Sequence, residues 1–434
     1  MENSAHSGYS FIAEEQGISQ YRMDVNGLEV LLVPMDLAPV TAFMITYRVG
    51  SRDESTGETG ATHFLEHLMF KGTERFSKAS GKTIFNTLQR VGARVNATTW
   101  LDRTNYYELL PSDKLALAIE IEADRMRGAS LALEDVNSER TVILNELDRG
   151  ENEPLRKLYQ TVWSTAFAAH PYRHPTIGWR SDVENLSAAQ LRKFYDAFYW
   201  PDNATVSIIG SFDPTEAMDA LSQHFGIIPR SPELYPSMYT KEPEQLGMRK
   251  ATVRMAGGPG AVMIAYKCPP AVAESSAALS ALSVILGNGK SCRLYSALVD
   301  SGLATGVSAS SSLLRDPGLF YAYAMLAPGV AHSDVESAII AEATRLRTGP
   351  VSDEELDLAK AVLRSETAYD RDGAFSMASG LNEAIAAGDW RLYLSIPERI
   401  ENVSIDDVKE AAEEIFDEDK MTVGNFIPRE QSEA

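Results

Sequence analysis

Residues 184–209 read ENLSAAQLRKFYDAFYWPDNATVSII, and residues 401–426, 217 positions later, read ENVSIDDVKEAAEEIFDEDKMTVGNF. Several positions are identical at this constant offset: Glu184/Glu401, Asn185/Asn402, Ser187/Ser404, Asp202/Asp419, Thr205/Thr422 and Val206/Val423. Each copy predicts a helix that begins after a serine, then an acidic turn and a β-strand. Because the offset is half of the 434-residue chain, we interpret the chain as an internal duplication.

The two copies imply two homologous domains joined by a proline-rich connector. A chain of this length exceeds the ~250 to 300 residues at which a single hydrophobic core stops growing. Four prolines fall close together between the copies: Pro229, Pro232, Pro236 and Pro243. Such a stretch is typical of an extended linker. We therefore predict a first domain over residues 1–228, a linker over 229–245 and a second domain over 246–434.

Strands and helices interleave in the first domain without the regular alternation of a parallel βαβ array. Asn26-Gly27 lies between the segments YRMDV and LEVLLVP and predicts a β-hairpin with a type I′ turn. Residues 41–50 and 95–111 predict strands, and residues 112–128 and 133–150 predict long helices. The pattern favours an α+β fold in which each domain is an antiparallel-rich sheet packed with helices.

The composition is that of a soluble globular protein, with 44% hydrophobic and 23% charged residues. The net charge of −21 argues against nucleic acid as a partner and favours cationic peptides. Cys268 and Cys292 are the only cysteines, which excludes a disulfide framework. No apolar run reaches the ~18 residues of a membrane span. The N-terminal segment lacks the basic and apolar regions of a signal peptide, so we expect a cytoplasmic chain, or a periplasmic one if a signal is removed before Met1.

The segment His63-Phe64-Leu65-Glu66-His67 carries the strongest chemical signal in the chain. In a helix, His63, Glu66 and His67 project from one face within an arc of about 100°. Phe64, Leu65, Leu68 and Met69 then lie on the other side of the helix and can pack inward. Two imidazoles and a carboxylate on one helix face indicate a metal site.

A catalytic zinc usually has three protein ligands and keeps its fourth position for water, so a third ligand is needed. Glu139 and Glu146 are seven residues apart and therefore share a helix face. Glu146 is the better candidate, although spacing alone does not say which carboxylate ligates the metal and which hydrogen bonds to a ligating imidazole. His170 and His174 are also four residues apart, but Pro171 and Pro175 interrupt a helix there and favour a structural role.

These residues resemble the pitrilysin (M16) family of zinc peptidases, whose inverzincin motif reverses the usual HExxH order. The resemblance covers nearly the whole chain. It includes Gly50-Ser51-Arg52-Asp53-Glu54, Asn96-Ala97-Thr98, His170 to Gly178, Phe194 to Gly210 and Leu286 to Leu294. Length and a single duplicated unit are similar to the short branch of the family, which includes mitochondrial processing peptidase subunits and bacterial relatives and acts as two-chain clamshells.

The resemblance implies that His63, His67 and Glu146 ligate one zinc ion per chain and that Glu66 is the general base. Glu139 then becomes the carboxylate that supports a ligating imidazole. The implied activity is that of a zinc endopeptidase acting on peptides or unfolded segments.

The resemblance also concerns the strand near Asn96, Ala97 and Thr98. In relatives this is an edge strand that holds an extended substrate by β-augmentation. Trp100, Tyr106 and Tyr107 follow on the same strand pair, but alternating aromatic residues in a strand more often serve packing.

The second half lacks residues that the family's active site uses. Many relatives have an Arg there and, seven residues later, a Tyr after Gly-Leu-Ala, whereas this chain has Leu298 and Thr305. We expect a different homologous subunit to supply the pair in a heterodimer. A homodimer of this chain would then bind zinc but have little activity. The alternative is that the pair has drifted and activity is weak.

The second half also has no second metal motif. By the 217 offset, Ser280, Ser283 and Val284 occupy the places of His63, Glu66 and His67. The segment Gly287-Asn288-Gly289-Lys290-Ser291 lacks the first glycine of a P-loop.

Two rival functions belong to other classes. A non-catalytic core or substrate-binding subunit of a larger complex would keep the fold but commonly lose the ligand set, which this chain retains. A metal-dependent hydrolase of another substrate would bind zinc without cleaving peptides.

Overall fold

The structure, a computed structural model, describes residues 6–36 and 38–429. Residues 1–5, which begin the segment considered for a signal peptide, lie outside the described residues. The chain divides into two compact units. Unit 1 consists of Met1–Asn145, Pro175–Tyr239 and Tyr369–Ala386, and unit 2 consists of Glu146–His174, Thr240–Ala368 and Ala387–Ala434. These spatial units differ from the contiguous ranges 1–228 and 246–434, because each contains one segment from the other half of the sequence.

Unit 1 has a seven-stranded sheet in the order β1-β2-β3-β7-β4-β6-β5. Its strands are β1 (Tyr9–Glu15), β2 (Ile18–Met23), β3 (Glu29–Pro34), β4 (Val40–Tyr47), β5 (Arg94–Thr99), β6 (Thr104–Pro111) and β7 (Ala204–Gly210). The neighbours β3 and β7 pair in parallel, and the other neighbouring pairs in the described sheet are antiparallel. The strand β5 lies at one edge of the sheet.

Unit 2 has a five-stranded sheet in the order β10-β11-β9-β12-β8. Its strands are β8 (Arg249–Met255), β9 (Ala261–Cys268), β10 (Ala304–Ser311), β11 (Gly318–Leu326) and β12 (Met421–Pro428). Here β8 and β12 form the parallel pair. The order β8-β12-β9-β11-β10 repeats β3-β7-β4-β6-β5 of unit 1, parallel pair included. The duplication predicted from sequence is therefore present in the topology, and the β1–β2 hairpin is an addition to unit 1.

The helices are α1 (Ala61–Leu68), α2 (Ile84–Arg90), α3 (Leu115–Gly128), α4 (Leu133–Glu151), α5 (Pro154–Ala166), α6 (Arg180–Asn185), α7 (Ala188–Phe198), α8 (Pro214–Phe225), α9 (Ser276–Gly287), α10 (His332–Thr348), α11 (Asp353–Asp370), α12 (Ala374–Ala387), α13 (Leu392–Asn402) and α14 (Ile405–Ile415). Six helices follow the same repeat, since α1, α3, α4, α5, α6 and α7 overlap α9, α10, α11, α12, α13 and α14 at the 217 offset. Short 3-10 turns cover Ser51–Asp53, Ser112–Lys114, Pro171–Arg173, Pro201–Asn203 and Glu418–Lys420, and a π-helical turn covers Tyr295–Asp300. The α+β fold is thus confirmed. None of the helices in the described part of the chain is long and apolar enough to cross a bilayer.

The predicted serine N-caps are confirmed at the start of α7 and α14. The Ser187 side chain accepts a hydrogen bond from the backbone N–H of Gln190, and Ser404 accepts one from Asp407, each within a capping box. A cap of this kind satisfies backbone donors that a helix start leaves open, so the helix begins at the same place in both copies.

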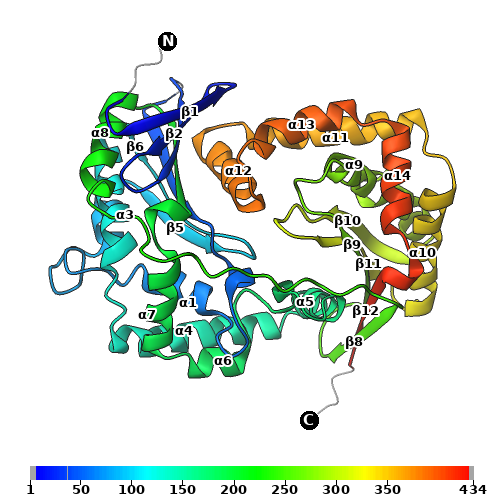
Figure 1. Ribbon diagram of the computed structural model, residues 1–434. Helices are drawn as coiled ribbons and strands as arrows, with labels where there is room; N and C mark the ends of the chain where they lie inside the picture. Colours follow the sequence, from blue (N-terminus) through cyan, green and yellow to red (C-terminus); the bar gives the residue numbers. More distant parts are fainter. Residues whose placement is uncertain (1–5, 37, 430–434) are drawn as a thin grey trace. The chain divides into compact units, whose positions relative to one another are not determined.

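One helix from each half of the sequence belongs to the other unit (Figure 1). Helix α5 packs on the unit 2 sheet so closely that a Cβ at Gly424 would lie 2.3 Å from Val162. Helix α12 packs on the unit 1 sheet, where Thr46 donates a 2.9 Å hydrogen bond to Asn382 and the rings of Tyr107 and Phe375 are 4.7 Å apart. At the 217 offset α5 coincides with the first part of α12, so the duplicated halves exchange equivalent helices.

The predicted hairpin between β2 and β3 is present, but the prediction of a type I′ turn is wrong. A type I′ turn needs positive φ at both central residues, and Gly27 has φ 80° whereas Asn26 does not have a positive φ. The Asn26 side chain is buried, where its Nδ2 donates to the carbonyls of Phe225 and Ile228 and its Oδ1 accepts from the N–H of Leu28. These tertiary bonds fix a longer loop.

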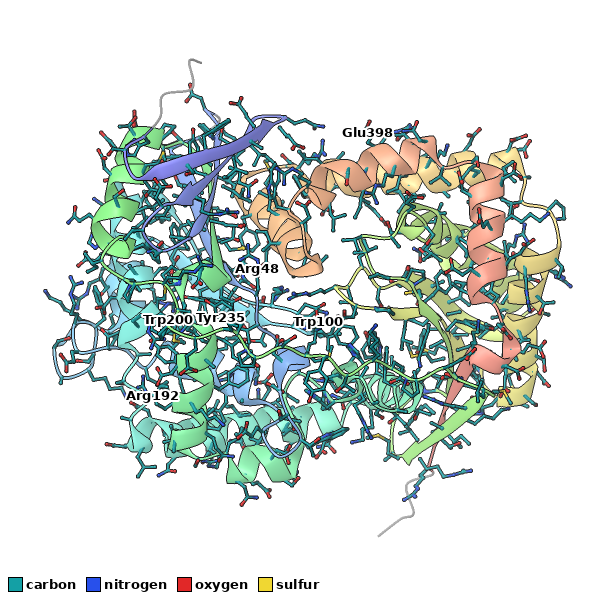
Figure 2. All side chains as sticks on the ribbon, viewed as in Figure 1. Arg48, Trp100, Arg192, Trp200, Tyr235 and Glu398 are labelled. Carbon is teal, nitrogen blue, oxygen red and sulfur yellow. The ribbon has the colours of Figure 1, made fainter. Side chains whose placement is uncertain are left out.

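The predicted linker, residues 229–245, contains no helix or strand. Its first part is fastened to unit 1 by Asp202, whose carboxylate accepts hydrogen bonds from Arg230, the N–H of Ser231 and the hydroxyl of Tyr235. Figure 2 labels Tyr235 on this connector. This irregular segment is therefore held to unit 1 by specific hydrogen bonds.

Candidate metal centre

Helix α1 carries the two histidines and the glutamate of the sequence motif. The segment is helical, as predicted, and Phe64, Leu65 and Leu68 are fully buried on its inner side. His63 and His67 are half-buried, with their rings 4.8 Å apart. The amphipathic pattern thus places both imidazoles on the polar face.

Glu146 lies near the two histidines. One ligand atom from each of His63, His67 and Glu146 lies within 4.8 Å of the others, and this is the only such group of three among the described residues. Glu146 comes from helix α4, which runs continuously from unit 1 past residue 145. Two imidazole nitrogens and one carboxylate oxygen match the donor set of a catalytic zinc, so these residues fit the metal that the motif implies.

Glu139 lies two turns before Glu146 on α4 and is buried. Its Oε2 is 2.8 Å from Nζ of Lys71, which follows α1 in the chain. Lys71 therefore compensates the charge of a carboxylate that would be costly to bury alone.

The start of α1 is held by the buried carboxylate of Glu54. Its two oxygens accept 2.8 Å hydrogen bonds from the N–H groups of Gly60 and Thr62. Burial raises the pKa of Glu54 to about 8, although these N–H groups favour the charged form. Gly60 has φ 86°, and a Cβ there would lie 2.5 Å from the carbonyl oxygen of Ile177. Only glycine fits this close approach, which places the helix that carries the histidines.

The candidate base Glu66 contacts the edge strand β5. Thr99 Oγ1 donates a 2.6 Å hydrogen bond to Glu66 Oε2. The sequence places Thr99 on the predicted substrate strand but predicts no contact with Glu66, and it assigns no role to Glu54. The residues around a threonine at the end of a strand do not indicate whether its hydroxyl contacts a carboxylate or solvent.

The predicted substrate segment Asn96–Thr98 lies on β5, and its predicted edge position is confirmed. Asn96 and Thr98 are exposed and Ala97 is buried. The strand ends at a turn with Trp100, which is 39% exposed and labelled in Figure 2. Tyr106 is fully buried, so packing accounts for it.

The duplicated positions in unit 2 hold no metal group. Ser280, Ser283 and Val284 lie on α9, and neither Ser283 nor Val284 exceeds 6% exposure. Among the described residues of unit 2, no three potential ligands come together. Leu298 is fully buried in the apolar core, and Thr305 is exposed on β10.

The second histidine pair has structural contacts. His170 Nδ1 accepts a hydrogen bond from the N–H of Tyr172, and its Nε2 lies 3.1 Å from Asp316 Oδ2. His170 therefore caps a 3-10 turn, and His174 ends that turn and is buried.

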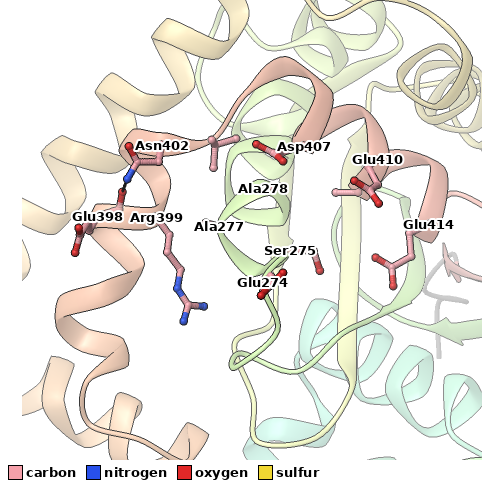
Figure 3. A pocket seen from close by; sticks show the side chains of 12 residues that line it. Glu274, Ser275, Ala277, Ala278, Glu398, Arg399, Asn402, Asp407, Glu410 and Glu414 are labelled. Carbon is pink, nitrogen blue, oxygen red and sulfur yellow. Dashed lines mark hydrogen bonds between the residues drawn. The ribbon is translucent and has the colours of Figure 1, made fainter.

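Unit 2 also has a pocket of about 630 Å³ beside α9, α13 and α14 (Figure 3). Its lining has one arginine, Arg399, and five acidic residues, Glu274, Glu398, Asp407, Glu410 and Glu414. None of the predicted site residues lines this pocket.

Comparisons with known proteins agree with the geometry. Residues 31–179 match the family described as Insulinase (Peptidase family M16), and residues 185–363 match the Peptidase M16 inactive domain. The chain is 30% identical over 402 residues to a zinc protease, PqqE, of Helicobacter pylori, with 92% of this chain and 90% of that protein covered.

Solved structures share the fold. A protease from Helicobacter pylori has a TM-score of 0.88 at 27% identity and covers 97% of this chain and 99% of its own. A chain of complex III2 from Candida albicans has a TM-score of 0.76 at 18% identity, with 92% and 94% covered, which shows the fold alone. On the family matches and the full-length similarity to PqqE, the chain belongs to the M16 family of peptidases.

Proposed function

We propose that the chain is a zinc-dependent endopeptidase subunit in which His63, His67 and Glu146 ligate one zinc ion. The observation that carries the proposal is the grouping of their ligand atoms within 4.8 Å. Three protein ligands of this kind leave a coordination position open, which distinguishes catalytic zinc from structural zinc.

Bound zinc would polarise the scissile carbonyl and lower the pKa of a water molecule toward ~7. Glu66 would accept the proton of the attacking water and later deliver it to the leaving amine. Because Glu66 lies between the two histidines on α1, one helix backbone places both the ligands and the base. Glu139, buried beside Lys71, would hold a ligating imidazole in orientation.

The substrate would be an extended peptide or an unfolded segment. The edge strand β5 passes the base, with its Thr99 bonded to Glu66, and presents the backbone of Asn96–Thr98. Pairing with that backbone would hold many sequences in the same register. The net charge of −21 would favour cationic peptides.

We further propose that a homologous partner subunit supplies an Arg/Tyr pair that this chain lacks. Leu298 is buried in the core of unit 2, where an arginine side chain would lack both solvent and space. A heterodimer would complete the site without that cost.

A non-catalytic core or substrate-binding subunit is the alternative function. The fold is compatible with such a role, since a chain of complex III2 has the same fold. The retained zinc donor set and base favour the peptidase, because a subunit without catalysis has no chemical need for them.

Metal analysis and cleavage of a quenched fluorescent peptide test the proposal, with the chain alone and with a homologous partner. We expect about one zinc per chain. Glu66→Gln should keep the zinc and lower kcat/KM by at least about 100-fold, since general-base catalysis contributes roughly 10²- to 10⁴-fold. Glu146→Gln should lose zinc.

Ser283→Ala is the matched control, because Ser283 occupies the place of Glu66 in the second copy. It should leave zinc content and kcat/KM unchanged. Absence of zinc from protein purified without chelators, together with full activity of Glu66→Gln, would refute the peptidase function.

A further inference from the structure

We propose that Thr99 is a positioning residue that fixes the carboxylate of Glu66, an inference that rests on the proposed peptidase function. The Thr99 hydroxyl donates a 2.6 Å hydrogen bond to Glu66 Oε2. This length is typical of bonds between a hydroxyl and an ionised carboxylate, about 2.5–2.7 Å. Neither residue belongs to the proposed ligand set, so the bond acts on the base and not directly on the metal.

The donor is anchored independently of Glu66. Thr99 is the last paired residue of β5, opposite Thr104 of β6. In the turn that follows, the N–H of Trp100 donates to the carbonyl of Arg103 at 2.9 Å, and the carbonyl of Trp100 accepts from the N–H of Ser51 at 3.1 Å. The hydroxyl is therefore presented from a fixed backbone.

The acceptor needs such a partner because glutamate has a long side chain. Helix α1 fixes the backbone of Glu66, through Glu54 at its start, but not the side-chain torsions. Catalytic groups must be held within about 0.5 Å of their working position. The bond from Thr99 supplies this constraint from a second rigid element.

The neighbouring threonine shows that the role is specific to position 99. Side chains alternate along a strand, so Thr98 points to the other face of the sheet. There its hydroxyl donates to Asn105 at 2.5 Å and accepts from Arg103 at 2.6 Å, and Arg103 Nε also donates to Glu383 of α12 at 3.1 Å. Thr98 ties β5 to its own sheet and to α12, whereas Thr99 ties β5 to the base.

A consequence follows for substrate binding. A peptide would pair with the backbone of β5, whereas the hydroxyl of Thr99 contacts Glu66 and not the peptide. Removal of the Thr99 hydroxyl should therefore impair the chemical step more than peptide binding, which separates a positioning role from a binding role.

Thr99→Val removes the hydroxyl and keeps the shape and the strand preference of the side chain. In the zinc-loaded enzyme, with partner if one is required, we expect kcat to fall about 10- to 100-fold, as for loss of a hydrogen bond to a charged group. KM should change less than about twofold, and zinc affinity measured by chelator competition should be unchanged. Thr99→Ser should restore kcat to within about threefold of wild type.

Thr41→Val is the matched control. Thr41 is a buried threonine of the same sheet whose hydroxyl donates a 2.7 Å bond to the carbonyl of Ser211. It should cost comparable stability in urea and leave kcat unchanged. A Thr99→Val enzyme with wild-type kcat, or a Thr99→Ser enzyme as slow as the valine variant, would overturn the positioning role.

A crystallographic experiment tests the positioning role of Thr99 even if the chain does not cleave peptides. In zinc-loaded crystals of Thr99→Val, the Glu66 carboxylate should leave its wild-type position while the α1 backbone, His63 and His67 stay in place. A carboxylate that remains in place refutes the inference. Failure of the wild type to cleave peptide would count against the proposed function alone.

Discussion

Arg125 lies in the interior of unit 1 with no solvent exposure, beside two equally buried carboxylates. Its Nε donates a 2.8 Å bond to Glu122, and its guanidinium lies 4.2 Å from the ring centre of Tyr106. Burial and the nearby Glu122 raise the pKa of Glu108 well above its usual range. The raised pKa favours the neutral form of Glu108, so the charged pair in this part of the core is Arg125 with Glu122.

Replacement of Arg125 by methionine should destabilise the protein by about 3–5 kcal/mol, because it leaves Glu122 as a buried charge without its partner. Urea unfolding measures the loss. Lys114→Met, just before the same helix, is the control, since Lys114 pairs with Asp113 at the surface and its loss should cost about 1 kcal/mol or less. A cost below about 1 kcal/mol for Arg125→Met would contradict the role given to the cluster.

At the scale of elements, the linker, residues 229–245, is attached to unit 2 through Glu242. Its carboxylate accepts hydrogen bonds from the N–H groups of Ala168, Ala169 and His170 and lies 2.9 Å from Lys267. Burial alone would raise the pKa of Glu242, but these donors outweigh it and lower the pKa to about 2. An irregular segment is therefore fastened by one anion bound to three backbone donors.

Glu242→Gln should lower the urea midpoint at pH 7. The folded pKa lies below the usual value of about 4.5, so the contribution of Glu242 is complete above that pH and is lost as pH falls toward 2. The difference between wild type and variant should thus shrink between pH 5 and pH 3. Glu244→Gln, an exposed neighbour on the same connector, should behave as wild type at each pH. A difference that grows with acidity would disprove the assignment.

At the scale of the whole molecule, duplication has produced two units with the same strand order and different contents. The first has His63, Glu66 and His67 on α1, with the edge strand β5 bonded to Glu66. The second has Ser280, Ser283 and Val284 at the equivalent positions of α9, and Leu298 in its core. We interpret this difference as a site in which unit 1 holds the metal ligands and a homologous subunit would supply the missing Arg/Tyr pair.

Addition of a homologous chain that carries the Arg/Tyr pair should raise kcat/KM by at least about 10-fold and yield a 1:1 complex by light scattering. An increase of this size corresponds to one or two charge-assisted bonds in the transition state. The control is the same partner with leucine and threonine in place of the pair, which should form the complex without activation. Full activity of the chain alone would contradict the need for a partner.

The sequence predicted the helix that carries the candidate ligands, and two helix starts, because these signals are local. The helix of His63 to His67 follows from apolar spacing, and the helix starts at Ser187 and Ser404 follow from capping chemistry, since both depend on residues within one turn. The turn at Asn26 was predicted wrongly, because buried tertiary bonds to Phe225 and Ile228 override a local preference.

The sequence by itself determined the family, the duplication, the α+β class and the metal motif, because repeats and short-range periodicity are written along the chain. Only the tertiary structure decided that α5 and α12 change units, that Glu54 holds the start of α1 and that Thr99 reaches Glu66. These contacts join residues that are far apart in sequence or on different elements. Their partners are set by packing and sheet order, which spacing along the chain does not encode.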